Sequence, residues 1–466
     1  MKIVIIGAGI SGCGAYLALK KHLPRPAPPA EDHTYTIYEA YDTARDTTFR
    51  ERPAHGETHS STLIVGGGLG VCPNGLSVLA RLDGDLLRDV VRAGYPVAHF
   101  KMQNAYGWEL FRGSAAGSTE PVMNTVSMSR HALWRCLRDR IPDDIIVNKR
   151  VSEVIANADG RNIVRFADDS PPVEADLVIG ADGLKSTAKN ALFQESTGDP
   201  YPPQYEGFVG VGGFVPVSPD IKSHVEPGTM TFTLGGNGFF GYAFSSSSPS
   251  DPNRDSPSHV PEPGNTVMWW STYSIASSPD PKTIDKDDIS RQLRQRHHNW
   301  RDPVIRTIIE SVTVESMYPV WTTPELPTWE RDGVILLGDA AHALPPNSGQ
   351  GASQALEDVE SFSLFLAHYL RKAYRNPLPT QVTTEKEAIK LAAKRHMDLR
   401  LPRVKAILEE AKRTQSRRRQ MTIVEEFIMY FAIWITGFFA SSKRASRERF
   451  DYNVAAEVER VLESEG

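Results

Sequence analysis

The sequence predicts an α/β fold with a parallel-sheet domain, a second domain built on an antiparallel β-sheet, and C-terminal helices. Two observations predict it. The chain opens on a short apolar strand, a glycine turn and a helix, which is the pattern of a Rossmann-type unit. The middle of the chain, residues 206–275, is instead rich in aromatic and β-branched residues and is interrupted by Gly, Ser and Pro, as antiparallel strands are.

The composition narrows the classes of protein that this chain can represent. The 466 residues are 40% hydrophobic and 23% charged, which is an ordinary globular composition for two or three domains. The net charge of −5 argues against a nucleic-acid partner. The three cysteines lie far apart, form no metal-binding pattern and indicate a reducing compartment. Because the first strand begins at once, we expect no signal peptide and a cytoplasmic protein.

The first glycine turn follows the apolar strand Lys2–Ile6 and precedes a helix. This context is the one that a GxGxxG motif needs to indicate dinucleotide binding. We expect Gly7 to make the turn, Gly9 to admit the pyrophosphate, and Gly12 to let the helix pack against the strand.

The second strand, Tyr35–Tyr38, ends in Glu39. An acidic residue at this point binds the ribose hydroxyl pair in Rossmann-type folds. The spacing from the glycine turn is longer than usual, and the proline-rich stretch 24–30 accounts for the excess as a surface loop. The alternative for Glu39 is a solvated strand end.

A second ligand-type segment covers residues 333–358. An apolar strand ends at Gly338-Asp339, and a loop with two prolines and two glycines then opens a helix. Gly349 and Gly351 let backbone N–H groups approach a ligand, and the helix N-terminus adds partial positive charge. Asp339 is placed to accept hydrogen bonds from a sugar-like chain. The alternative is an ordinary crossover between a strand and a helix.

This segment resembles the second flavin motif of the single-component FAD-dependent aromatic hydroxylases, the group A monooxygenases that include p-hydroxybenzoate and salicylate hydroxylase. In that family the Asp holds the ribityl chain, the proline and glycine loop lies along the isoalloxazine, and the helix points its N-terminus at the flavin. The resemblance therefore implies FAD contacts by Asp339, Pro346, Gly349, Gly351 and Ala352.

Three more positions gain a role from the same resemblance. Gly67, in a glycine-rich segment that ends in Pro-Asn, and Arg130, at a helix start, correspond to cofactor contacts of the family. Asp182 lies in a segment that resembles the family's middle motif, which serves flavin and NAD(P)H binding. Lys189 stands where the family usually has an arginine, and lysine lacks the bidentate fork. The alternatives are a flexible turn for Gly67 and a surface residue for Arg130.

The antiparallel sheet is expected to cover the flavin and to bind the substrate. Tyr242 is a candidate catalytic residue that faces the substrate, with a core aromatic as the alternative. Gly212 stands where family members often carry an arginine, which argues against a small anionic substrate.

The resemblance implies an FAD-dependent monooxygenase that uses NAD(P)H and O2. In the family, oxygen adds at flavin C4a and one oxygen atom passes to an electron-rich substrate. Here we expect hydroxylation or epoxidation of a bulky aromatic or polycyclic small molecule, of the kind found in secondary metabolism. The alternatives are a reductase, a non-catalytic flavin-binding scaffold and a flavin-dependent halogenase, although the halogenase motif Trp-x-Trp-x-Ile-Pro is not present.

The predicted domains are discontinuous. The FAD-binding domain comprises residues 1–95, 115–190 and 320–375, the substrate-binding β-sheet domain comprises 96–114 and 200–315, and a C-terminal helical region comprises 376–466. In that region residues 427–440 are almost wholly apolar. This run is shorter than the about 20 residues of a membrane-spanning helix. It is expected either to pack on the flavin domain or to make a peripheral membrane contact.

Overall fold

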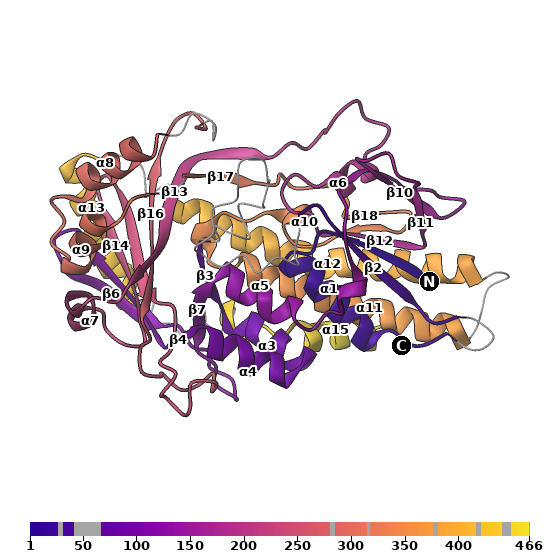
Figure 1. Ribbon diagram of the computed structural model, residues 1–466, viewed down its shortest axis with the longest axis horizontal. Helices are drawn as coiled ribbons and strands as arrows, with labels where there is room; N and C mark the ends of the chain where they lie inside the picture. The colour runs from indigo at the N-terminus through magenta and orange to yellow at the C-terminus, as the bar shows by residue number, and fades with distance from the viewer. Residues whose placement is uncertain are drawn as a thin grey trace.

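The computed structural model shows two sheet-based domains joined by long helices (Figure 1). It describes residues 1–26, 31–41, 67–279, 285–314, 317–375, 381–415, 421–439 and 449–465. The parallel-sheet domain lies on the right in Figure 1, and the antiparallel-sheet domain lies on the left.

The parallel sheet is built from strands whose two faces are both buried. β1 (Lys2–Ile6) lies between β12 (Leu177–Gly180) and β2 (Thr34–Glu39), and all three run parallel. Because successive side chains point to opposite faces, Ile5 packs with the helices on one side and Ile6 packs with the layer on the other. The order β18-β19-β12-β1-β2-β8 is completed by β8 (Ile146–Asn148), β18 (Glu330–Arg331) and β19 (Val334–Leu336).

Two different layers cover this sheet. Helices pack on one face: α1 (Ile10–His22), α3 (Pro73–Leu82), α4 (Gly84–Ala93), α5 (Arg130–Arg138) and α11 (Gly351–Arg375). The other face carries a short helix and a three-stranded sheet: α6 (Thr187–Leu192), β9 (Val151–Ile155), β10 (Asn162–Phe166) and β11 (Val173–Ala175). A further small sheet has the order β3-β7-β4: β3 (Gly68–Val71), β4 (Tyr95–Val97) and β7 (Thr125–Ser129).

The second domain is a seven-stranded sheet with the order β17-β13-β16-β15-β14-β5-β6. Its neighbouring strands are antiparallel except for β14 and β5. The strands are β5 (His99–Asn104), β6 (Glu109–Ser114), β13 (Gln204–Pro216), β14 (Thr229–Gly235), β15 (Gly238–Phe244), β16 (Thr266–Ser274) and β17 (Tyr318–Thr322). Since β17 belongs here, the predicted boundary at residue 320 falls inside a strand.

One face of the antiparallel sheet is covered by three helices. They are α7 (Pro219–His224), α8 (Lys286–His297) and α9 (Pro303–Ser311). The apolar cluster between sheet and helices includes Phe240, Trp269 and Ile305, all of them buried. The opposite face is directed towards the parallel-sheet domain over part of its area.

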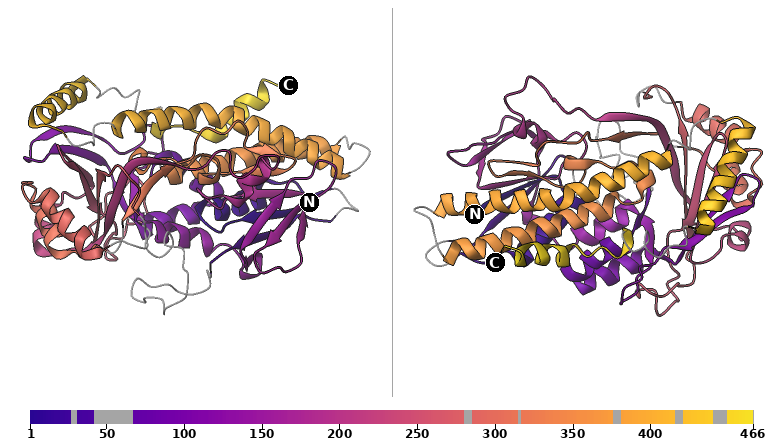
Figure 2. Two further views of the ribbon diagram at one scale, coloured as in Figure 1. Left: turned by 90° about the horizontal axis from the view of Figure 1, so that it is seen from above. Right: turned by 180° about the vertical axis from the view of Figure 1, so that it is seen from behind.

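The C-terminal helices contact both domains (Figure 2). α12 (Gln381–Gln415) runs along α11, α13 (Ile423–Phe439) packs on the antiparallel sheet, and α15 (Val454–Glu463) returns to α11. Met429, Tyr430 and Ile433 of α13 are buried. The apolar run thus packs on the antiparallel sheet and not on the flavin domain as expected, whereas residue 440 lies outside the described residues. Within the described part of the chain, no helix is long and apolar enough to cross a membrane.

Candidate functional site

The first glycine turn has the geometry that a phosphate-binding loop requires. Gly7 has a positive φ of 95°, and a Cβ there would lie 2.6 Å from the carbonyl oxygen of Ala181. A Cβ at Gly12 would overlap the carbonyl oxygen of Gly7, so only glycine lets the helix pack this closely. At Gly9, by contrast, no atom lies within 4 Å of a Cβ. The turn therefore leaves open space beside the first backbone N–H groups of α1, where an anion can bind.

Glu39 ends β2 beside this turn. One of its carboxylate oxygens accepts a hydrogen bond from the Ala8 N–H at 2.6 Å, and the other accepts one from the Tyr41 N–H at 3.1 Å. The side chain is buried, and burial raises the pKa of the carboxyl group. Because each oxygen has two lone pairs, both can still accept a hydrogen bond from a ribose hydroxyl.

The turn after β19 packs directly on α1. Gly338 has a φ of 61°, and a Cβ there would overlap the hydroxyl of Ser11, which lies in the first turn of α1. Asp339 follows and begins the short helix α10 (Asp339–His342). The structure thus brings Asp339 next to the first glycine turn, although more than 300 residues separate the two segments in the sequence.

The proline and glycine loop leads from this turn into α11. Pro346 begins a 3-10 turn, and Gly349 ends it with a φ of 61°. No atom lies within 4 Å of a Cβ at Gly349 or at Gly351, the first residue of α11. Ala352, the second residue of α11, is half-buried. The N-terminus of a 25-residue helix therefore opens onto free space.

Gly67 and Arg130 lie side by side next to this loop. The backbone N–H of Arg130 donates to the carbonyl oxygen of Gly67 at 3.3 Å, and no atom lies within 4 Å of a Cβ at Gly67. Further along the same segment, the N–H of Cys72 donates to the hydroxyl of Ser353 in α11 at 3.1 Å. The structure therefore brings Gly67 and Arg130 together, and it brings the other end of β3 to the start of α11.

Asp182 lies behind the first glycine turn, but its carboxylate caps α6. One oxygen accepts the hydroxyl of Ser186, and the other accepts the N–H of Thr187, both at 2.6 Å. Burial raises the pKa of this carboxyl, although the hydrogen bonds to the helix act to lower it. Asp182 thus shapes the loop behind the site with its backbone, while its oxygens are engaged with protein groups.

Lys189 does not reach this space. The side chain is buried, and Nζ donates to Asp199 Oδ2 at 2.7 Å and to the carbonyl oxygen of Tyr201 at 2.6 Å. It therefore holds the segment after α6 instead of offering a free cation to a ligand.

In the structure, Tyr242 lies apart from the other candidate residues. Its hydroxyl donates to Asp302 Oδ2 at 2.9 Å, and Asp302 caps the N-terminus of α9. The side chain is 4% exposed, and burial raises the pKa of the phenol out of its usual range. Tyr242 lies on the helix-covered face of the sheet, so its placement argues against the predicted catalytic role and agrees with the alternative of a core aromatic.

The opposite face of the sheet meets the predicted cofactor segments. We call it the cleft face and define it by Phe232, Gly241, Met268 and Trp270, which are paired across β14, β15 and β16 or lie two residues apart. A Cβ at Gly68 in β3 would overlap the sulfur of Met268. The segment that begins at Gly67 is therefore packed against this face.

Trp270 lies at the centre of the cleft face, and the sequence analysis missed it. Both of its cross-strand neighbours, Gly212 and Gly241, are glycines. A Cβ at Gly241 would overlap the indole, so the ring lies flat over that strand. The ring of Phe232 follows at a centroid distance of 6.0 Å. The two glycines are the sequence feature that could have identified Trp270, but they do so only once the strand register is known.

These residues fit FAD, the cofactor implied by the resemblance. Open space lies at the glycines of both loops, and two helix N-termini face it. Three buried polar atoms beside these segments have no partner within the described protein: Asn74 Oδ1, His342 Nδ1 and Gln350 Nε2. Buried polar atoms usually have a hydrogen-bond partner, so a bound ligand or water suits these positions. Asn74 and Gln350 were not identified from the sequence.

Comparison with known families agrees with this fit. The family model described as "FAD binding domain" matches residues 135–395, which is more than half of the chain. Salicylate hydroxylase of Pseudomonas putida is 25% identical over 394 residues, covering 79% of this chain and 76% of that protein. Zeaxanthin epoxidase of Spinacia oleracea is 29% identical over 262 residues. The alignment covers 55% of this chain but only 34% of that epoxidase, so the chain spans about a third of its length.

Solved structures share the fold over almost the entire chain. Klebsiella pneumoniae HpxO, in complex with FAD and uric acid, has a TM-score of 0.67 at 20% identity and covers 96% of this chain and 97% of its own. CtdE, in complex with FAD and a substrate, has a TM-score of 0.69 at 18% identity and covers 100% of this chain and 98% of its own.

Proposed function

The chain belongs to the FAD-binding domain family, and from this premise we propose that it is an FAD-dependent monooxygenase. It would use NAD(P)H and O2 to hydroxylate or epoxidise a bulky, electron-rich aromatic or polycyclic small molecule. Relatives with this type of activity in their names, such as salicylate hydroxylase, support the proposal.

The observation that carries the proposal is the contact between the cleft face and the cofactor segments. Met268 packs on Gly68, and the rings of Trp270 and Phe232 continue the same face. Aromatic side chains provide large apolar surfaces for stacking. Phe232 and Trp270 also pack against the cluster that contains Met429 and Tyr430 of α13, so a flat substrate would lie on the part of this face nearest Met268 and the predicted cofactor loops.

Each cofactor segment has a distinct part in this proposal. FAD supplies the transfer of electrons from NAD(P)H and the activation of O2. The N–H groups at the start of α1, beside Gly9, would bind the pyrophosphate. Those at the start of α11, beyond Gly351, would stabilise negative charge on the ring edge. Asp339 would accept hydrogen bonds from the ribityl hydroxyls.

The centre of the cleft face favours an uncharged substrate. Gly212 stands where related hydroxylases often place an arginine, and its cross-strand partner is Trp270. An indole that lies over Gly241, with Gly212 as its other cross-strand neighbour, offers a wide apolar platform and no fixed cation for a carboxylate. We therefore propose a bulky, neutral ring system and not a small anion such as salicylate.

A substrate screen tests this function. The FAD-loaded protein should oxidise NADH or NADPH slowly alone, and several-fold faster with a member of a panel of neutral polycyclic phenols and indoles. Salicylate is the small anionic control, and it should give no acceleration. With 18O2 the product should carry one labelled oxygen atom.

Each alternative gives a different result in the same assay. Faster NAD(P)H oxidation with an unlabelled, reduced product would identify a reductase. A halide-containing product that forms only with added bromide or chloride would identify a halogenase. Flavin binding without any oxidation of NADH or NADPH would identify a non-catalytic flavin protein. Each of these outcomes would overturn the monooxygenase proposal.

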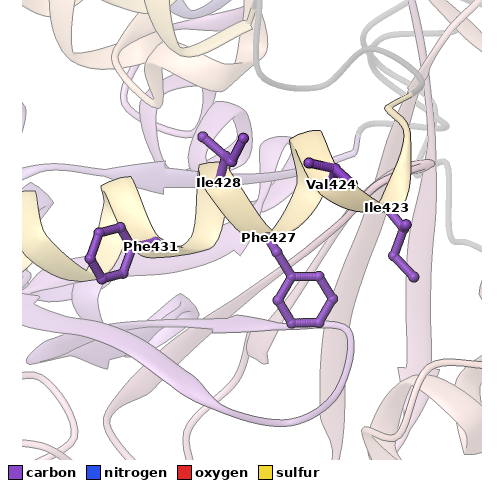
Figure 3. A pocket seen from close by; sticks show the side chains of 5 residues that line it. All are labelled: Ile423, Val424, Phe427, Ile428 and Phe431. Atoms are coloured by element: carbon purple, nitrogen blue, oxygen red, sulfur yellow. The ribbon is translucent and has the colours of Figure 1, made fainter.

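We also propose a peripheral membrane contact through α13. One face of this helix is buried on the antiparallel sheet, but the other exposes apolar side chains (Figure 3). Ile428 is 63% exposed and Phe431 is 61% exposed. Trp108, in the turn between β5 and β6, is 60% exposed and lies with its ring 6.5 Å from that of Phe427. The exposed apolar surface consists of Trp108, Ile423, Val424, Phe427, Ile428, Phe431 and Trp434.

A lipid surface suits this face better than a second protein molecule. A helix of 17 residues offers a strip of about 25 Å by 10 Å, well below the ~800 Å² per partner of a stable protein interface. Its two carboxylates lie in the first turn, where Glu425 accepts the N–H of Thr422 at 2.8 Å and Glu426 accepts the hydroxyl of Tyr430. In the sequence, three cations follow outside the described residues, and anionic headgroups attract such charges: Lys443, Arg444 and Arg447.

Vesicle binding checks this contact. The full-length protein should sediment with vesicles of phosphatidylcholine and phosphatidylserine, whereas the double variant Ile428→Glu, Phe431→Glu should remain in the supernatant. Leu391→Glu, at an exposed leucine of α12, is the matched control and should sediment like the unchanged protein. A protein that ignores vesicles and forms dimers lost in the double variant would show that a second copy covers this face.

A further inference from the structure

Two adjacent carboxylates of α11, those of Glu357 and Asp358, are buried together and are paired with two arginines of α12. Arg400 of α12 is 0% exposed; its Nε donates to Asp358 Oδ1 at 2.9 Å, and its Nη1 donates to Glu357. Arg403 adds a hydrogen bond from Nε to Glu357 Oε2 at 2.8 Å. Buried charges are tolerated only when they are paired and hydrogen-bonded. The ion cluster therefore strongly favours a single arrangement of these side chains.

The second oxygen of Asp358 holds the turn that carries Asp339. It accepts the backbone N–H of Gly338 at 2.9 Å and contacts His342 Nε2 at 2.6 Å. These two groups lie on either side of Asp339 in the chain. Burial alone would raise the pKa of Asp358, but the interactions with His342 and Arg400 keep it below its ordinary value. The carboxylate thus stays charged and binds the turn at neutral pH.

Glu357 holds the other two segments. Its Oε1 accepts Asn74 Nδ2 at 2.6 Å, and the same amide nitrogen also donates to Gln350 Oε1 at 3.0 Å. Asn74 belongs to the start of α3, shortly after Gly67, and Gln350 lies between the two glycines of the proline and glycine loop. One further atom of each side chain has no hydrogen-bond partner within the described residues and can bind a ligand: Asn74 Oδ1 and Gln350 Nε2.

We propose that Glu357 and Asp358, paired with Arg400 and Arg403, are positioning residues for FAD. They tie three chain segments, each with a predicted cofactor contact, to a single ion cluster formed by protein groups. Loops that are already ordered lose less conformational freedom when a ligand arrives, so affinity rises. The inference rests on FAD binding and not on the oxygenation reaction, and the two can fail separately.

Binding of FAD to the apoprotein provides the test. Asp358→Asn should raise the Kd for FAD about tenfold or more, because Arg400 loses one of its two carboxylate partners and an NH2 group replaces one of the two oxygens that accept from Arg400 and from Gly338. Arg400→Lys keeps one charge but lacks the planar fork, and it should raise the Kd by a smaller factor. Fluorescence titration gives the Kd, and thermal unfolding of each apoprotein gives the Tm.

Glu360→Gln is the matched control. Glu360 is a buried carboxylate on the same helix, and it accepts two hydrogen bonds of 2.7 Å from Arg81, which lies at the opposite end of α3 from Asn74. This variant should lower the Tm of the apoprotein and leave the Kd for FAD unchanged. An equal rise of the Kd in Glu360→Gln would overturn the proposal. So would Asp358→Asn with a lowered Tm and an unchanged Kd, and if that variant does not fold, an unchanged Kd in Arg400→Lys decides against it.

Discussion

Gly9→Val is expected to give a folded protein that contains almost no FAD. Among the described residues, no atom lies within 4 Å of a Cβ at this position, so these residues leave room for the valine side chain. It would instead fill the open space that the pyrophosphate needs beside the N-terminus of α1. Circular dichroism and the Tm of the apoprotein report folding, and absorbance at the flavin band after gel filtration reports the cofactor content.

Gly12→Val separates the two uses of glycine in the same turn. Its Cβ would overlap the carbonyl oxygen of Gly7, which is rigid backbone, so this variant should fail to fold into soluble protein. The two variants therefore distinguish a glycine that leaves room for a ligand from a glycine that allows close packing of the helix. A folded Gly9→Val protein with a full complement of FAD would show that this turn does not bind the phosphates.

Truncation after residue 419 is expected to give aggregated or flavin-poor protein. The cut removes Met429, Tyr430 and Ile433, which are buried on the antiparallel sheet, and Val454 and Val458, which are buried against α11. Burial of one large apolar side chain contributes about 1.5–3 kcal/mol. Together these residues contribute on the order of 10 kcal/mol, which is comparable to the stability of a typical domain. Solubility, gel filtration and flavin absorbance measure the outcome.

The same truncation also removes a connection between the two domains. Phe450 packs its ring 6.2 Å from that of Phe100 in the antiparallel sheet, and Tyr452 lies under the guanidinium of Arg403 in α12. The hydroxyl of Tyr369 in α11 donates to Glu465 at 2.8 Å. Yellow, monodisperse protein after the cut would contradict this expectation and would show that the C-terminal residues are dispensable for the flavin site.

Local geometry explains why the glycine segments could be predicted from the sequence. A turn that needs positive φ, or a helix that must approach a backbone, accepts only glycine. The residue type at Gly7 and Gly12 is therefore enough to predict the local geometry. The apolar run of β1 is equally local, and the structure places this strand where the sequence predicts it. The prediction of an α/β fold with an added antiparallel sheet follows from these local patterns.

The face of the sheet to which a strand side chain points could not be predicted in the same way. Along β15 the side chains alternate between two faces, and both faces carry aromatic residues, so period two alone does not say which face meets the cofactor. The sequence analysis therefore selected Tyr242, which faces α9, and missed Trp270 on the cleft face. The register with β13 and β15 decides this, because it places Gly212 and Gly241 beside Trp270.

The sequence by itself determined the order of the dinucleotide-type segments, the glycines that shape their turns and the family that they resemble, because each depends on residues close together in the chain. Only the tertiary structure decided how these segments are joined. The side chains of Glu357 and Asp358 look like the polar part of an ordinary amphipathic helix until α12 brings Arg400 to them. Their charges are stable in the interior only through partners contributed by distant segments, and such pairing leaves no local pattern in the sequence.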